Sequence, residues 1–355
     1  ENAPNLSLSL NSITLVSNEL SDNIVQQAPI IPAPDTSLLV QEEFYVNSDS
    51  DIEIFVRNKR LSSMTEFSSA KTVVYIHGSR IWSDNHFDLQ LDNFSWMDYI
   101  AAQGYDVYFL NIRGYGRSTR PSPLTLNVPG IAAIGNTEEG TRDLAAVVEF
   151  IQQRRNIQKV ILIGHSAGTG KVLRYANLYP NNVEKVVLCG ASWRNPTVVP
   201  SESSIPTYRN FTAQDIKNYV QKGIPVSRKA EIIPTDYLDA LWAESLASDP
   251  TSSQTDPPTV TEPNGWLNDM QTNWTTDGVT PLWNCAEIYV PVLVTTGEWD
   301  TTSPPQWQKH TVADLVNAPW KAYVELAQGA HFMAVQTNRM TLFNTVQQFL
   351  DQQNF

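Results

Sequence analysis

The sequence predicts an α/β protein whose mainly parallel sheet is covered by helices on both faces. Short apolar runs rich in β-branched residues alternate with segments of helical periodicity along most of the 355 residues. This alternation stops between about residues 195 and 283, where Pro, Ser and Thr clusters separate short helix-like pieces, and then resumes. The interruption is too long for a loop between a strand and a helix, so it predicts a mostly helical cap inserted between two strands.

The predicted elements follow one another in a regular order. Residues 44–46 and 52–56 flank the turn-rich stretch 47–51, which predicts a β-hairpin. The apolar runs then predict strands at 72–76, 107–112, 160–163, 183–188, 292–296 and 322–326. The segments of helical periodicity predict helices at 96–103, 138–154, 169–178, 307–316 and 340–352.

The composition divides the chain into three parts. Residues 1–40 are polar and end in a Pro-rich stretch, which predicts an N-terminal extension. Residues 41–195 and 284–355 hold the alternating elements and form the predicted core. Residues 196–283 form the predicted cap, which we expect over the carboxyl edge of the sheet because it is inserted between two parallel strands.

The bulk composition is that of a globular protein and excludes several classes. Hydrophobic residues make up 41% of the chain, which is enough to bury a substantial core. The net charge of −13 repels phosphate backbones and therefore disfavours nucleic-acid binding. No run of about 18 apolar residues occurs, so we expect no transmembrane helix.

The cysteine content and the first residue of the chain bear on the cellular compartment of the protein. Cys189 and Cys285 are too few for a disulfide framework, so buried free thiols are the favoured interpretation, and no Cys/His cluster offers a zinc site. No signal-peptide pattern is present, yet the chain starts at Glu1, which indicates removal of a preceding segment. Four N-x-S/T glycosylation sequons occur, at Asn5, Asn93, Asn210 and Asn273. They permit secretion without requiring it, so a secreted or periplasmic location and a cytoplasmic one both stay open.

The feature most directly tied to chemistry is the pentapeptide Gly-His-Ser-Ala-Gly at 164–168. It follows the apolar run 160–163 and precedes the helix-like stretch 169–178. A sharp turn from strand into helix leaves the residue at the turn strained and exposed, and small neighbours are needed because larger side chains would clash. The motif and its context therefore nominate Ser166 as a nucleophile.

A serine hydroxyl needs a base to take its proton, and the base needs a third group to orient it. Active sites of this architecture lie at the carboxyl ends of strands, and His331 follows the last predicted strand. Asp300 follows the strand at 292–296 and is the predicted orienting carboxylate. Glu298 is the alternative, and the competing interpretation is that either carboxylate caps the next helix. The sequence thus predicts Ser166, His331 and Asp300 as a catalytic group.

Charge that develops on a carbonyl oxygen is best stabilised by backbone N–H groups. Ala167 is at the start of the helix after Ser166 and supplies one predicted donor. The His77-Gly78 pair ends the strand at 72–76, so the N–H of the following Ser79 is the predicted second donor. We expect the side chain of His77 to pack this loop.

With these motifs in order, the chain resembles a capped α/β-hydrolase of the serine hydrolase branch, over about residues 44–355. The resemblance rests on five features in register: His77-Gly78, the Arg113-Gly114-Tyr115-Gly116-Arg117-Ser118 turn, the elbow around Ser166, Gly297 with Asp300, and Gly329 with His331. It implies an α/β-hydrolase fold with the chain order nucleophile, acid, base. Asn111 departs from the Asp that such relatives usually carry, at a position that is structural. A serine at 166 argues against the similar dehalogenases and epoxide hydrolases, which use an Asp nucleophile.

Side chains near these motifs are candidate substrate contacts. Arg80 follows the oxyanion loop and would suit a substrate carboxylate, although a surface ion pair is the commoner role. The other candidates are His165, Trp193 and Trp299. Aromatic residues of the insertion and its borders form either the core of the cap or an apolar or aromatic substrate pocket: Trp193, Tyr208, Phe211, Tyr219, Tyr237, Trp242, Trp266, Trp274 and Trp283.

The sequence therefore predicts a serine hydrolase that cleaves a small carboxylic ester or lactone through an acyl-enzyme, with no metal or organic cofactor. Hydrolysis of amides, thioesters or C–C bonds and acyl transfer remain alternatives on the same residues. A non-catalytic ligand-binding protein of the same fold is the remaining class. Neither the substrate nor the oligomeric state follows from the sequence.

Overall fold

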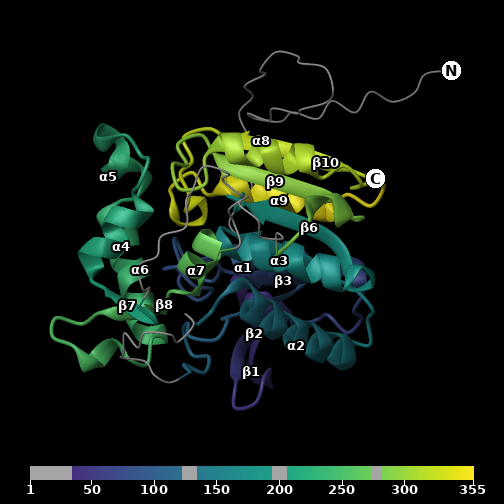
Figure 1. The fold of residues 1–355 in the computed structure, drawn as a ribbon, viewed down its shortest axis with the longest axis horizontal. Coiled ribbons are helices and arrows are strands. Elements are labelled where there is room, and N and C mark those ends of the chain that lie inside the picture. The colour runs from purple at the N-terminus through teal and green to yellow at the C-terminus, as the bar shows by residue number, and fades with distance from the viewer. Residues whose placement is uncertain (1–33, 122–133, 194–205, 273–281) are drawn as a thin grey trace.

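The computed structural model describes residues 34–121, 134–193, 206–272 and 282–355 (Figure 1). Its centre is an eight-stranded sheet with the order β1-β2-β4-β3-β5-β6-β9-β10. These strands are β1 (Leu39–Asn47), β2 (Glu53–Leu61), β3 (Thr72–Ile76), β4 (Asp106–Leu110), β5 (Val160–His165), β6 (Val183–Cys189), β9 (Val292–Gly297) and β10 (Lys321–Leu326). Strand β2 pairs antiparallel with β1 and β4, and the other neighbours are parallel. The predicted mainly parallel sheet is confirmed.

Both faces of the sheet are buried, because successive side chains of its strands enter two separate cores. On β3, Val74 and Ile76 pack into one cluster, whereas Val73 and Tyr75 pack into the other. Helices on the first face are α2 (Thr137–Arg155), α3 (Ala167–Leu178) and α8 (Pro305–Asp314). Helices on the second face are α1 (Trp96–Ala102) and α9 (Met340–Asp351). This layering explains the continuous apolar runs of the central strands.

The predicted hairpin is present but longer than its apolar pattern indicates. Its strands β1 and β2 pair from Leu39 with Leu61 to Asn47 with Glu53. The added residues of β1 are exposed or half-buried, since β1 is at the edge of the sheet. Edge strands carry polar residues that do not give a strong apolar signal. Strand β1 also starts inside the segment predicted as an N-terminal extension, of which residues 1–33 lie outside the described part.

The described residues 206–272, between β6 and β9, form the cap, which Figure 1 shows beside the core. It is mostly helical, as predicted, with α4 (Ala213–Val220), α5 (Lys229–Ile232), α6 (Thr235–Ser248) and α7 (Gly265–Thr272). It also holds an unpredicted antiparallel hairpin of β7 (Tyr208–Phe211) and β8 (Val260–Pro263). Phe211, Tyr219 and Tyr237 are buried in the same cluster as α2 and α3, whereas Trp274 lies outside the described residues. The proposed boundary at 195/196 also lies outside them.

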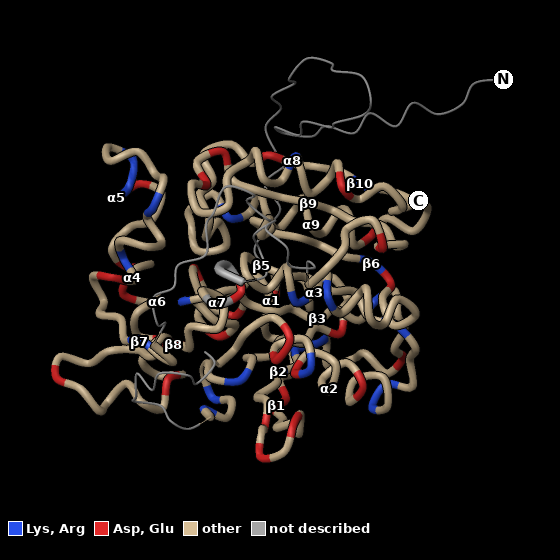
Figure 2. Tube along the Cα trace, viewed as in Figure 1, with Lys and Arg blue, Asp and Glu red and all other residues tan. Residues whose placement is uncertain are grey.

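Buried polar contacts fasten the cap to the core. The indole N–H of Trp82 donates to Ser248 Oγ at 2.8 Å, and Asn85 Nδ2 donates to Ser245 Oγ at 2.8 Å. Figure 2 shows acidic and basic positions interspersed over both core and cap. Within the described ranges, no helix combines the length and apolar character that crossing a membrane requires.

Candidate active site

Ser166 stands at a sharp turn between β5 and α3. Its backbone has φ 51° and ψ −126°, a sparsely populated region for a residue with a side chain. Its N–H donates to the carbonyl of Cys189 at 2.9 Å, which ties the turn to β6. A Cβ at Gly168 would lie 2.5 Å from the carbonyl oxygens of Ile76 and His77, so only glycine allows α3 to start this close to β3. The turn therefore has the strand–turn–helix geometry that the motif predicts.

Asp300 and His331 meet beside this turn, at the carboxyl ends of β9 and β10. His331 Nδ1 donates to Asp300 Oδ2 at 2.7 Å, and both side chains are 1% exposed. The other carboxylate oxygen of Asp300 accepts the N–H groups of Thr302 and Ser303, each at 2.8 Å. These bonds hold the carboxylate in place, and the carboxylate in turn holds the Nδ1 edge of the imidazole ring.

The other ring nitrogen of His331 is buried and hydrogen-bonds to no residue of the described chain. A hydrogen bond from Ser166 to this nitrogen is therefore not formed. The two residues are nevertheless linked through His165, whose Nε2–H donates to the carbonyl of His331 at 2.9 Å. Catalytic hydrogen bonds are commonly longer without substrate than in the reacting complex.

Of the two carboxylates that the sequence nominates beside His331, only Asp300 contacts it. Glu298 is exposed, and its Oε2 accepts the backbone N–H of Gln328 at 2.9 Å. Both residues follow the end of β9, but the side chain of Asp300 is buried while that of Glu298 remains at the surface. This geometry distinguishes two residues that the sequence pattern alone does not.

The loop after β3 lies against Ser166. A Cβ at Gly78 would be 2.7 Å from Ser166 Cβ, so Gly78 is in direct contact with the turn. His77 holds this loop, since its Nδ1–H donates to the Gly78 carbonyl at 2.7 Å and its Nε2 accepts the Ile112 N–H at 3.1 Å. The N–H of Ser79 donates to no residue in the described ranges. Ala167 is the first residue of α3, where an N–H has no acceptor within the helix.

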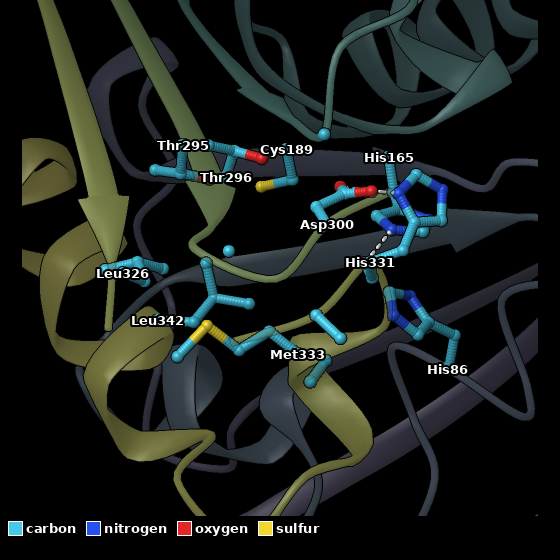
Figure 3. Close-up of a pocket in the computed structure, with 14 residues that line it drawn as sticks. His86, His165, Cys189, Thr295, Thr296, Asp300, Leu326, His331, Met333 and Leu342 are labelled. Atoms are coloured by element: carbon cyan, nitrogen blue, oxygen red, sulfur yellow. Dashed lines mark hydrogen bonds and ion pairs between the residues drawn. The ribbon is translucent and has the colours of Figure 1, made fainter. Parts of the chain in front are cut away.

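Three histidines line a small cavity of about 20 Å³ beside the site, shown in Figure 3. The His165 ring centroid lies 4.4 Å from that of His86 and 4.8 Å from that of His331. Burial, followed by repulsion from neighbouring histidines, lowers the pKa of His86 to about 3 and that of His165 well below 6.5. His86 Nδ1 is 2.5 Å from the hydroxyl of Tyr75. His86 stands in a loop without a motif, so no sequence pattern predicts it as part of the site.

Comparison with known proteins identifies the fold family. A family model described as alpha/beta hydrolase fold matches residues 71–336, well over half of the chain. The chain belongs to the alpha/beta hydrolase family. Membership in this family supports the interpretation of the chain as a hydrolase.

Among its relatives, this chain is 27% identical to a bifunctional esterase/perhydrolase of Acinetobacter calcoaceticus, over 50% of its own length and 54% of that protein. It therefore spans about half the length of that relative. A non-heme chloroperoxidase of Streptomyces lividans is 26% identical over 72% of this chain and 84% of the relative. The solved bromoperoxidase of Bacillus anthracis is 20% identical, with a TM-score of 0.60 over 88% of this chain and all of that one. At that identity the likeness shows the shared fold.

The candidate substrate contacts of this family member occupy different environments. The guanidinium of Arg80 lies 3.9 Å from the centre of the Tyr219 ring, and the residue is paired with Glu262. Trp193 stacks on His310 with ring centroids 4.5 Å apart. Trp299 is half-buried and follows β9 next to Asp300. His165 is buried behind Ser166. A role in substrate binding stays a prediction for all four, although Arg80 already has a carboxylate partner.

Proposed function

We propose that this hydrolase is a serine hydrolase that cleaves carboxylic esters or lactones through an acyl-enzyme. The observation that carries the proposal is the buried Asp300–His331 hydrogen bond next to the strained Ser166 turn. A nucleophile, a base and an orienting acid at the carboxyl ends of neighbouring strands fit acyl transfer.

In the proposed acylation step, His331 Nε2 takes the proton of the Ser166 hydroxyl as its oxygen attacks the carbonyl carbon. This nitrogen is suited to the task because it is unpartnered while Nδ1 is committed to Asp300. Asp300 holds the imidazole in the required tautomer and stabilises the imidazolium that forms. His331 then returns the proton to the leaving alkoxide, and an alcohol departs.

The tetrahedral intermediate carries its negative charge on the former carbonyl oxygen. The N–H groups of Ala167 and Ser79 are the proposed donors to this oxyanion. In the second half-reaction, His331 deprotonates a water that attacks the acyl carbon. The Ser166 oxygen leaves with the proton from His331, so a carboxylic acid is released and the enzyme is restored.

The choice of ester or lactone over other acyl compounds rests on the similarity to known proteins. One relative is named an esterase/perhydrolase, which fits attack on an ester carbonyl. Amide, thioester or C–C bond hydrolysis and acyl transfer would use the same residues. A small apolar or aromatic substrate is proposed because aromatic side chains are gathered in the cap.

Turnover of a panel of p-nitrophenyl esters, lactones and amides tests the proposal. We expect esters or lactones to be hydrolysed and amides to react much more slowly. The matched Ser166→Ala variant should lose about 10⁴-fold or more in kcat on every substrate of the panel. Turnover of amides alone would contradict the ester assignment. Unchanged turnover by Ser166→Ala would contradict the nucleophile.

A further inference from the structure

A buried carboxylate of the cap contacts the loop after β3. Glu262 of β8 is 1% exposed, and its Oε2 accepts the backbone N–H of Arg80. Its other oxygen, Oε1, accepts Arg209 Nε at 2.8 Å. The sequence separation between Arg80 and Glu262 is 182 residues, so this contact joins the cap to the core beside Ser79.

The backbone of Arg80 is in a conformation that needs support. Its φ of 65° is left-handed, which is uncommon for a residue with a long side chain. Its guanidinium lies 3.9 Å from the centre of the Tyr219 ring and 5.1 Å from that of Phe211. Strained backbone persists only where its surroundings hold it. Here the carboxylate holds the peptide N–H, while two aromatic rings of the cap hold the side chain.

Strand β8 is itself fixed, so Glu262 is presented from a rigid base. Arg120 Nη1 donates to the carbonyl of Thr261 at 2.9 Å, and the Thr261 N–H donates to Asp249 Oδ2 at 2.7 Å. On its other side, Pro263 packs against Gly114 so closely that a Cβ there would lie 2.7 Å from the proline ring. The β7–β8 hairpin is therefore held in a fixed position against the core.

We propose that Glu262 is a positioning residue for the oxyanion loop, an inference that rests on the proposed function. By accepting the Arg80 N–H, it fixes the peptide plane that joins Ser79 to Arg80. The His77 Nδ1–H bond to the Gly78 carbonyl fixes the preceding plane, which carries the Ser79 N–H. With both planes held, the Ser79 backbone cannot rotate, and its N–H keeps one orientation. Donors that are oriented before reaction stabilise an oxyanion without reorganisation during the step. Burial raises the pKa of Glu262, and its two arginine neighbours oppose that effect. A costly buried carboxylate at this place is consistent with a role beyond packing.

The competing explanation is that Glu262 only pairs with Arg209 to hold the β7–β8 hairpin together. Three variants separate these roles. Arg209→Gln removes the ion pair and leaves the carboxyl group facing the Arg80 N–H. The double variant Glu262→Met/Arg209→Met replaces both charges by apolar side chains of similar length, which commonly preserves stability, and removes the acceptor. Glu262→Gln keeps an acceptor oxygen without the charge.

The test measures kcat, KM and Tm on p-nitrophenyl acetate, together with Ki for a trifluoromethyl ketone, which forms a tetrahedral oxyanion on a serine. We expect the double variant to lose about 10- to 100-fold in kcat, below the loss for a deleted donor, with KM changed less than about twofold. Its Ki should rise by a similar factor. Glu262→Gln should recover most of kcat, and Arg209→Gln should keep it.

A double variant with the kcat and Ki of the parent protein would overturn the inference. An Arg209→Gln variant as impaired as the double variant would also overturn it, because the effect would then be structural. Should the double variant not fold, Glu262→Met alone, which also removes the acceptor, is compared with Arg209→Gln, and equal kcat and Ki in these two variants would overturn the inference. Ser166→Ala is assayed in parallel. If Ser166→Ala loses turnover while the Glu262 variants keep it, only this inference fails. If Ser166→Ala stays active, the proposed function fails.

Discussion

The Nδ1 atom of His331 lies 2.7 Å from Oδ2 of Asp300, and neither side chain reaches solvent. The two residues follow adjacent parallel strands, β10 and β9, so the register of the sheet sets their meeting. In this buried setting the carboxylate accepts one imidazole N–H and two backbone N–H groups. Such a fixed arrangement leaves the far nitrogen of His331 as the ring atom available for proton transfer.

Asp300→Asn should lower kcat by about 10³- to 10⁴-fold, because an amide N–H facing His331 would favour the wrong tautomer. The fold should persist, since the amide oxygen can still accept the N–H groups of Thr302 and Ser303. Ester turnover and thermal unfolding check both statements. Glu298→Gln is the matched control at an exposed carboxyl of the same loop and should retain activity. Nearly normal turnover by Asp300→Asn would remove Asp300 from the mechanism.

Gly190→Ala should impair catalysis through the Asp300–His331 pair. A Cβ at Gly190 would lie 3.1 Å from Nδ1 and Cε1 of His331 and 3.3 Å from Asp300 Oδ2. Gly104→Ala is the matched control, because its φ of 80° is also left-handed while nothing lies within 4 Å of the added atom. Both variants should lose roughly 1–2 kcal/mol of unfolding free energy to backbone strain. Only Gly190→Ala should lower kcat, by about tenfold or more for a 1 Å displacement. Equal kcat in the two variants would contradict this account.

The buried histidines should make the fold sensitive to acid. Burial lowers the pKa of His77 and His86 to about 3 in the folded chain, below their value of about 6.5 in an unfolded chain. The unfolded chain therefore binds more protons below about pH 6.5, and stability falls as the pH drops from there towards about 3. Each histidine should contribute roughly 1 kcal/mol per pH unit to that loss. Urea unfolding at several pH values should show a shallower slope for His86→Asn, which keeps a polar atom near Tyr75. An unchanged slope would rule out this origin.

Glu244 of α6 should have the opposite pH effect. Burial, followed by the charge of Asp84, raises its pKa to about 7, while Arg57 lowers it. Because the folded pKa is above the unfolded one, stability is greatest at low pH and falls as pH rises through about 7. After allowance for solvent screening, Glu244→Gln should stabilise the protein by about 1 kcal/mol near pH 8 and have little effect near pH 4.5.

Urea unfolding at both pH values measures this difference. The control is Asp239→Asn, which removes a charge from the exposed side of α6. It should show no such pH dependence. A gain for Glu244→Gln that is equal at both pH values would show that its charge is not the cause.

The central strands and the turn at Ser166 could be predicted from the sequence because their determinants are local. Strand β3 is apolar at every position from Val73 to Ile76 since both its faces are buried. The turn needs small residues at fixed spacing around one serine. Outside the hairpin of β1 and β2, the ends of the core helices and strands were predicted within two residues of those observed. The fold class and family resemblance are confirmed by the family match.

The parts that escaped prediction depend on contacts between distant segments. Strands β7 and β8 are four residues each and include the polar Arg209 and Asn210, so their pairing leaves little periodic signal. His86 joins the histidine cluster only because a loop folds back over β5. Glu262 reaches Arg80 only through docking of the cap. Sequence periodicity reports which face a residue occupies, but it does not report which loops meet.

The central claim is that Ser166 is the nucleophile. Its most direct test is labelling with a fluorophosphonate, followed by intact mass and peptide mapping, in the parent chain and in Ser166→Ala. The account predicts a single adduct on Ser166, loss of ester turnover in proportion to labelling, and no adduct in Ser166→Ala. An adduct on another residue, or an unlabelled Ser166 in a protein that hydrolyses esters, would contradict it.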